Sequence, residues 1–154
     1  MDKKRIGRIL LCAAALLAAL IAGFVIYGAA GNPRTRQRFR LDQTKIPQGT
    51  EKITGYFRND SFAEATCGAA FSLDREENGV WTEVPYKNGE AFFYLWARSV
   101  RRFIGGTPVV YDLEGYYGEL TPGTYRINVS VSVKRAGQDW YDVPLSATFE
   151  ITEK

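Results

Sequence analysis

The residues best suited to recognition chemistry form an aromatic and basic run in the second half of the chain. The run comprises Phe92, Phe93, Tyr94, Trp96, Arg98, Arg101 and Arg102. Aromatic faces and guanidinium groups together favour a sugar or an anionic polymer as ligand. The competing interpretation is a core strand followed by a loop of solvated arginines. Because successive side chains of a strand point to opposite faces, one of Phe92, Phe93 or Tyr94 should be exposed or covered by another element. An exposed cluster that includes Tyr94, Trp96, Trp140 or Tyr141 would favour binding, and burial of these residues would favour a spacer.

A second aromatic pair, Trp140 and Tyr141, follows the polar stretch at residues 135–138. A loop at the end of a β-domain is a common place for a binding contact. The pair is therefore a second candidate for partner binding, and the alternative is that it closes the end of a hydrophobic core.

Catalytic and metal chemistry has little support in the residue types. The chain has no histidine and two cysteines. Cys12 lies inside the apolar segment and Cys67 in the part expected to fold, so the two predict neither a disulfide nor a CxxC metal site. Asp112, Glu114 and Glu119 lack the dense spacing of a calcium loop, so we interpret them as solvated carboxylates. We expect no catalytic residues, no metal and no cofactor, and we interpret Cys67 as a small buried residue.

An apolar segment precedes everything that can fold into a domain. Residues 9–30 contain no charged side chain, and as a helix they would extend about 33 Å, enough to cross a hydrocarbon core of about 30 Å. The alternative is a cleaved signal peptide, because Gly28, Ala29 and Ala30 provide small residues before Gly31. The apolar run is longer than a usual signal core, so the sequence favours an uncleaved anchor held in membrane lipid.

The positive charge of the chain is concentrated on both sides of this segment. Basic residues dominate residues 1–8, which we predict to be a cytoplasmic end, and residues 31–40, while residues 41–154 carry sixteen Asp or Glu against twelve Lys or Arg. This distribution does not favour nucleic-acid binding, and it leaves the orientation of the helix open. Residues 31–47 are predicted to be a basic stalk, and residues 48–154 a folded domain.

The domain reads as a series of short strands. Residues 125–134 alternate apolar and polar side chains, and residues 53–58 and 147–151 follow the same period of two. Residues 70–76 and 80–84 flank Asn78-Gly79, a strong hairpin signal, with Phe71 and Leu73 facing the core and Trp81 packing nearby. Residues 92–96 and 109–113 are further candidates, and residues 96–104 are expected to form a helical turn or an irregular crossover.

These strands predict an all-β antiparallel sandwich of about seven strands behind one transmembrane helix. Leu120, Pro122 and Gly123 lead into the best strand, with Tyr125 at its start. That arrangement is typical of a tyrosine corner, in which the phenol bonds an upstream backbone group.

Four motifs follow one another along the domain: Gly68-x-x-Phe71-x-Leu73, Asn78-Gly79-x-Trp81-x-x-Val84, Tyr117-Gly118-x-Leu120-x-Pro122-Gly123-x-Tyr125-Arg126-Ile127 and Ala147-x-Phe149-x-Ile151. In this order they resemble the bacterial immunoglobulin-like domain of anchored or exported proteins of Gram-positive bacteria. The resemblance covers about residues 48–152. It implies an extracytoplasmic, immunoglobulin-like antiparallel β-sandwich without catalytic residues. We interpret Trp81, Gly118, Leu120, Pro122, Gly123 and Tyr125 as structural.

We therefore expect a single-pass membrane protein with an outward, non-enzymatic module for binding, adhesion or spacing at the cell surface. Its ligand would be a protein or a cell-wall polymer. The alternatives are a secreted carbohydrate- or wall-binding module released after Ala30, and an accessory or regulatory subunit of another membrane protein.

Overall fold

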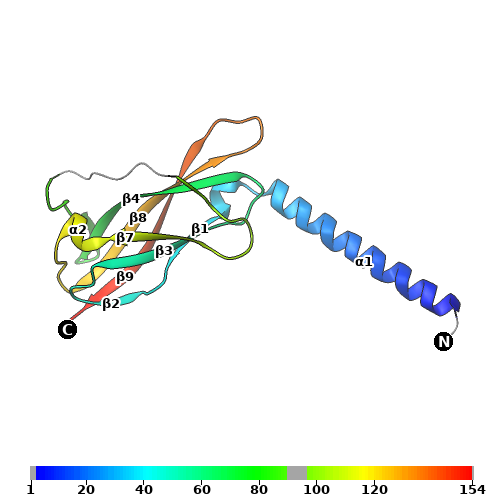
Figure 1. Cartoon of the computed structure of the whole chain (residues 1–154), viewed down its shortest axis with the longest axis horizontal. Helices are drawn as coiled ribbons and strands as arrows, with labels where there is room; N and C mark the ends of the chain where they lie inside the picture. Colours follow the sequence, from blue (N-terminus) through cyan, green and yellow to red (C-terminus); the bar gives the residue numbers. More distant parts are fainter. Residues whose placement is uncertain (1–2, 90–96, 154) are drawn as a thin grey trace.

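The computed structural model of the protein describes residues 3–89 and 97–153. A long helix, α1 (Lys3–Ala30), leads into a β-sandwich and projects from one end of it, while the C-terminus lies at the opposite end (Figure 1). Within α1, Ile9–Tyr27 has a mean hydropathy of 2.9 and none of it is buried against the domain. This one helix is long and apolar enough to cross a membrane.

One sheet of the sandwich has three strands in the order β1-β3-β7. They are β1 (Gln37–Leu41), β3 (Lys52–Asn59) and β7 (Thr107–Asp112), and both pairings are antiparallel. A short helix, α2 (Leu113–Tyr117), follows β7, with Asp112 as its N-cap.

The other sheet has the order β2-β9-β8-β4-β5, with β6 pairing beside β4. Its strands are β2 (Lys45–Pro47), β4 (Glu64–Glu77), β5 (Val80–Glu83), β6 (Arg98–Ser99), β8 (Gly123–Lys134) and β9 (Tyr141–Thr152). All pairings in it are antiparallel except β2 with β9, which is parallel. The prediction of an immunoglobulin-like all-β sandwich is confirmed, with more strands than the seven expected.

The core lies between the two sheets and is formed by the apolar positions of the alternating strands. Leu73, Ile127 and Val133 are fully buried in the larger sheet, opposite Phe57 and Tyr111 of the smaller one. Phe71 also lies in this core, as predicted, whereas Trp81 is only half-buried. At the predicted hairpin, Asn78 and Gly79 both have positive φ, the backbone that a two-residue turn of this kind requires.

The predicted tyrosine corner has the expected geometry. Tyr125 is buried, and its hydroxyl donates to the Thr121 carbonyl over 2.9 Å. Leu120 is buried just before it, and Gly118 has a φ of 74°, which explains glycine there. This motif therefore closes the end of the sandwich that is distant from α1.

The prediction of a stalk at residues 31–47 is wrong. Asn32 caps a 3-10 helix, η1 (Pro33–Arg36), and β1 follows at once and pairs with β3 along its whole length. β2 then pairs with β9. The domain accordingly begins at the end of α1, because Pro33, Gln37 and Leu41 are buried in it.

Candidate partner-binding surface

The basic half of the aromatic and basic run lies on the side of the sandwich that adjoins α1. Arg98 belongs to β6 and donates to the Pro108 carbonyl over 3.0 Å. Arg101 and Arg102 follow in an irregular loop and are exposed, and the Arg102 Nε donates to the Ala63 carbonyl. Residues 92–96, with Tyr94 and Trp96, lie outside the described residues, so their part of the predicted site is not placed.

Trp140 and Tyr141 lie at the hairpin between β8 and β9, near the same end of the sandwich (Figure 1). The Trp140 side chain is 46% exposed, with the Lys134 ammonium 5.9 Å from its ring centroid. Tyr141 is half-buried beneath the Arg34 guanidinium, 5.0 Å away. The structure therefore brings Trp140 close to cations, while Tyr141 packs against the segment that follows α1.

A basic groove on the outer face of the three-stranded sheet was not among the sequence predictions. It has a volume of about 540 Å³ and is lined by Arg38, Phe39, Arg40, Tyr56, Arg58, Gly105 and Gly106. Alternate residues of β1 and β3 point outward, which places the three arginines on one face. The Arg40 guanidinium lies 4.9 Å from the Tyr56 ring, and Asp60 pairs with Arg58 over 2.7 Å and with Arg38 over 3.8 Å.

This groove has the chemistry of an anion-binding surface. Guanidinium groups bind carboxylates and phosphates through paired hydrogen bonds, and Tyr56 adds an aromatic face. Asp60 holds Arg38 and Arg58 in place from one side. The sequence contained a signal for this strand, because arginine alternates with other residues from Arg34 to Arg40. The buried positions Pro33 and Gln37 are not strongly apolar, however, so the segment has the composition of a hydrated linker.

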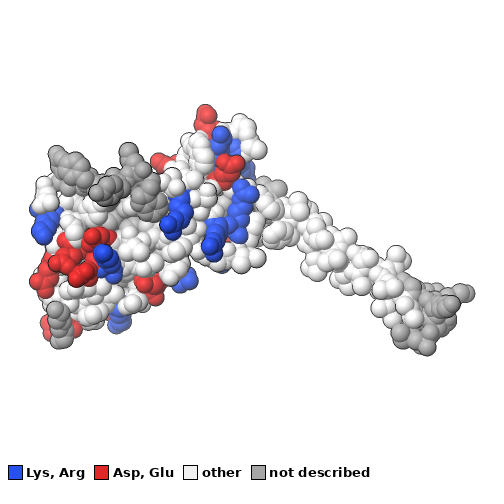
Figure 2. All heavy atoms as spheres, in the orientation of Figure 1, with Lys and Arg blue, Asp and Glu red and all other residues white. Residues whose placement is uncertain are grey.

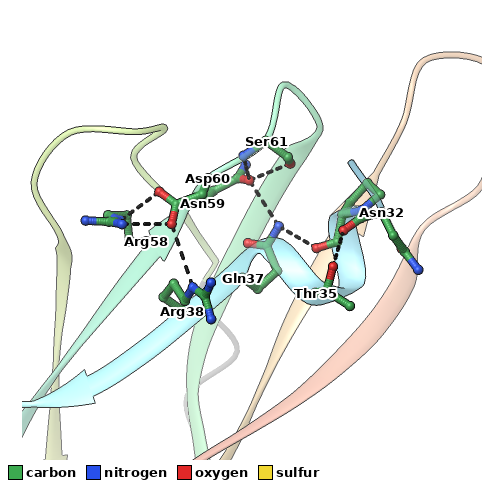
Figure 3. Close-up of polar contacts among 9 residues, drawn as sticks. Asn32, Thr35, Gln37, Arg38, Arg58, Asn59, Asp60 and Ser61 are labelled. Atoms are coloured by element: carbon green, nitrogen blue, oxygen red, sulfur yellow. Dashed lines mark hydrogen bonds and ion pairs between the residues drawn. The ribbon is translucent and has the colours of Figure 1, made fainter. Parts of the chain in front are cut away.

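A buried polar network connects η1 to the sandwich (Figure 3). Asn59, which is 0% exposed, accepts hydrogen bonds at Oδ1 from Gln37 Nε2 at 3.0 Å, the Ser61 amide at 3.0 Å and the Ser61 hydroxyl at 2.6 Å. Its Nδ2 donates to the Ala63 carbonyl at 2.7 Å. Gln37 Nε2 also donates to the Pro33 carbonyl of η1. We call Asn59, Gln37 and Ser61 the junction network.

The same asparagine fixes the loop at residues 100–106. The backbone N–H of Asn59 donates to the Arg101 carbonyl at 3.1 Å, and the backbone N–H of Phe103 donates to the backbone carbonyl of Asn59 at 2.8 Å. Phe103 has a φ of 58°, an uncommon conformation for an aromatic residue. The junction network therefore joins η1, β1, the β3–β4 loop and this second loop at one point.

Charge is divided between the two ends of the sandwich (Figure 2). Basic side chains prevail at the end that adjoins α1, where Arg34, Arg36, Arg38, Arg58, Arg98, Arg101, Arg102, Lys134 and Arg135 lie with Asp60, Glu64, Asp139 and Asp142. Acidic side chains prevail at the other end, among them Asp112, Glu114 and Glu119. Asp112 caps α2, and Glu119 accepts from Gln48, so each has a structural contact.

The outer face of the larger sheet carries a separate ion pair. Asp74 of β4 lies opposite Arg126 of β8 and accepts from its Nε at 3.0 Å and from Asn128 at 2.9 Å. Burial raises the pKa of Asp74, but the hydrogen bonds from Asn128 and Arg126 outweigh it and lower that pKa overall. The Arg126 guanidinium also lies 4.6 Å from the Trp81 ring, so Trp81 packs on this pair.

Reactive groups of the kind that catalysis needs are not assembled in the described part of the chain. Burial raises the pKa of the Cys67 thiol to about 11, and it also raises the pKa of Tyr111 and Tyr117. Among residues 3–89 and 97–153, no three His, Cys, Asp or Glu side chains lie together as a metal site would require.

Comparison with known proteins gave one family. The family model described as bacterial Ig-like domain matches residues 33–150, which covers the whole sandwich up to β9 and begins at η1. No match was found among curated proteins or among solved structures. The start of the matched region at residue 33 agrees with the structure in including the arginine-rich segment in the domain. The chain therefore belongs to the bacterial Ig-like domain family.

Proposed function

We propose that this protein is a single-pass membrane protein that holds one non-enzymatic Ig-like module outside the cytoplasm. The observation that carries the proposal is the helix α1, whose apolar residues along Ile9–Tyr27 are not buried inside the protein, while its last turn leads directly into the sandwich. An apolar helix of this length is stable in lipid and unfavourable in water. The family supports an extracytoplasmic place for the domain.

The role at the membrane is proposed to be recognition, with the basic groove as the contact surface. Arg40 and Tyr56 line the groove beside each other, and Asp60 pairs with the neighbouring Arg38 and Arg58. Such a surface fits a carboxylate- or phosphate-bearing wall polymer or an acidic face of a partner protein. A spacer role, a secreted module cleaved after Ala30 and an accessory subunit are the alternatives.

The first experiment measures whether the helix is retained and where the domain lies. The full chain is expressed in a bacterial host, and its intact mass, membrane fractionation and digestion by protease added to protoplasts are determined. Full-length mass, membrane retention and loss of the domain to protease are expected, with a cytoplasmic protein as the undigested control. A mass that begins at Gly31 would support the secreted alternative, and a protected domain would contradict the proposed orientation.

The second experiment tests the groove. The full chain in detergent is bound to immobilised polyphosphate, and the salt concentration for elution is compared between wild type, Arg40→Glu and Lys52→Glu. Lys52 is an exposed basic residue of the same sheet outside the groove, so its variant controls for the change in net charge. Elution of Arg40→Glu at clearly lower salt than Lys52→Glu is expected. Equal elution of both variants would leave the groove without a specific role.

A further inference from the structure

We infer that the end of the sandwich that adjoins α1 rests on the lipid bilayer, with Phe62, Phe103 and Ile104 inserted beside the helix. We call these three residues the apolar loop tips. They belong to the β3–β4 loop and to the loop at residues 100–106. The inference rests on the proposed function, because it requires that α1 is retained in the membrane.

The contacts of Phe24 fix the depth of the loop tips. The Phe24 ring lies 5.8 Å from the Phe62 ring and 4.9 Å from the Phe103 ring, and those two rings are 5.1 Å apart. Phe24 is part of the apolar stretch Ile9–Tyr27, six residues before the end of α1 at Ala30. At 1.5 Å per residue, the loop tips reach about 9 Å back along the helix.

The length of the apolar stretch keeps Phe24 at the boundary of the bilayer. Nineteen residues of helix extend about 28 Å, close to the hydrocarbon thickness of about 30 Å. If Phe24 were lifted into water, residues 9–23 would remain and would extend only about 22 Å. Phe62 and Phe103, which contact Phe24, must then lie at the same level, where lipid headgroups meet the acyl chains.

The exposure of the loop tips agrees with a lipid partner. Ile104 is 83% exposed and Phe62 is 40% exposed, although both adjoin a well-packed core. The loop that carries Ile104 is held by the junction network through the Phe103 amide, and Phe103 keeps its positive φ there. A large apolar side chain presented at a fixed, strained loop tip is unfavourable in water and favourable in a membrane interface.

The surrounding charges and aromatic rings suit the headgroup layer. Tyr27, an interfacial type of residue, lies in the last turns of α1, and the Arg36 guanidinium is 3.5 Å from its ring centroid. Arg34, Arg101 and Arg102 are exposed at the same end of the sandwich. Guanidinium groups at this level can bond lipid phosphates, and anionic lipids strengthen the attraction.

Site-directed spin labelling of the full chain tests the inference. The chain carries Cys12→Ala, and Cys67 is 3% exposed, so a nitroxide attaches only at an introduced cysteine. Labels at Ile104→Cys and Phe62→Cys are compared with Val80→Cys, which is 63% exposed at the far end. Vesicles contain phosphatidylcholine alone or with phosphatidylglycerol at a ratio of seven to three. Accessibility to oxygen and to a water-soluble nickel chelate is measured.

We expect the labels at 104 and 62 to lose accessibility to the nickel chelate and to gain accessibility to oxygen, while the label at 80 stays accessible to nickel. Adding phosphatidylglycerol should strengthen this contrast, and replacing Arg34, Arg101 and Arg102 by glutamine should remove the added effect. Full nickel accessibility at both 104 and 62 would overturn the inference. That result is distinct from failure of the proposed function, which a cellular mass beginning at Gly31 would reveal.

Discussion

Replacing Asn59 by alanine is expected to destabilise the sandwich more than any exposed substitution. The buried side chain of Asn59 makes four hydrogen bonds: its Oδ1 accepts three and its Nδ2 donates one. Alanine would leave the Ser61 amide and hydroxyl without their acceptor in a place that water does not reach, since Ser61 is 1% exposed. Gln37 Nε2 and the Ala63 carbonyl would each keep one other partner.

The magnitude follows from those two orphaned donors. An unsatisfied buried donor costs about 1–3 kcal/mol, so the free energy of unfolding should fall by about 3 kcal/mol. For a domain of this size the midpoint of thermal unfolding would fall by roughly 10 °C.

Urea unfolding of the full chain in detergent, followed by tryptophan fluorescence, measures the loss. Asn88→Ala is the matched control, because Asn88 is exposed in a turn and its replacement should change stability by less than about 0.5 kcal/mol. A loss below about 1 kcal/mol for Asn59→Ala would refute the reasoning that the junction network holds η1 and the two loops together.

Three further predictions concern single residues. Asp74→Asn should lower the free energy of unfolding at pH 7 by about 1 kcal/mol. Because folding lowers the pKa of Asp74 below 3.8, the difference from wild type in urea titrations should begin to decrease near pH 4 and continue to decrease as the pH falls through the lowered pKa. A difference unchanged at pH 3 would contradict this. Cys67 should react with iodoacetamide only after unfolding in urea, as measured by mass in the Cys12→Ala chain. The reason is that a thiol pKa of about 11 leaves roughly one thiolate in a thousand at pH 8. Rapid labelling of the folded chain would show that the thiol is not buried. Gly55→Ala would place a Cβ against the Phe39 ring and 2.8 Å from the Tyr111 Cε2. The free energy of unfolding should therefore fall by about 1–3 kcal/mol in the same urea assay. An unchanged midpoint of unfolding would show that these rings can move aside.

Strands with a strict apolar alternation were predictable from the sequence. Ile127, Val129 and Val131 alternate with polar residues in β8 and are buried as expected. The turn at Asn78-Gly79 was predictable as well, because few residues tolerate the backbone conformation it needs.

The segment at residues 31–47 was not predictable in the same way, because its buried face is only partly apolar. Pro33 and Gln37 occupy buried positions, and the outward positions of β1 are arginines, a composition shared with hydrated linkers. The junction network and the basic groove escaped prediction for a related reason. Both join residues from separate strands, and only the pairing of β1 with β3 brings Gln37 beside Asn59.

The direct passage from α1 through η1 into β1 places the sandwich next to the end of the helix. If α1 spans the membrane as proposed, the sandwich extends from the lipid by its own length, about 40 Å for the twelve residues of β8. A partner at the outermost boundary of a thick wall would be beyond this range. Under the proposed binding role, the partner must therefore come within a few nanometres of the lipid.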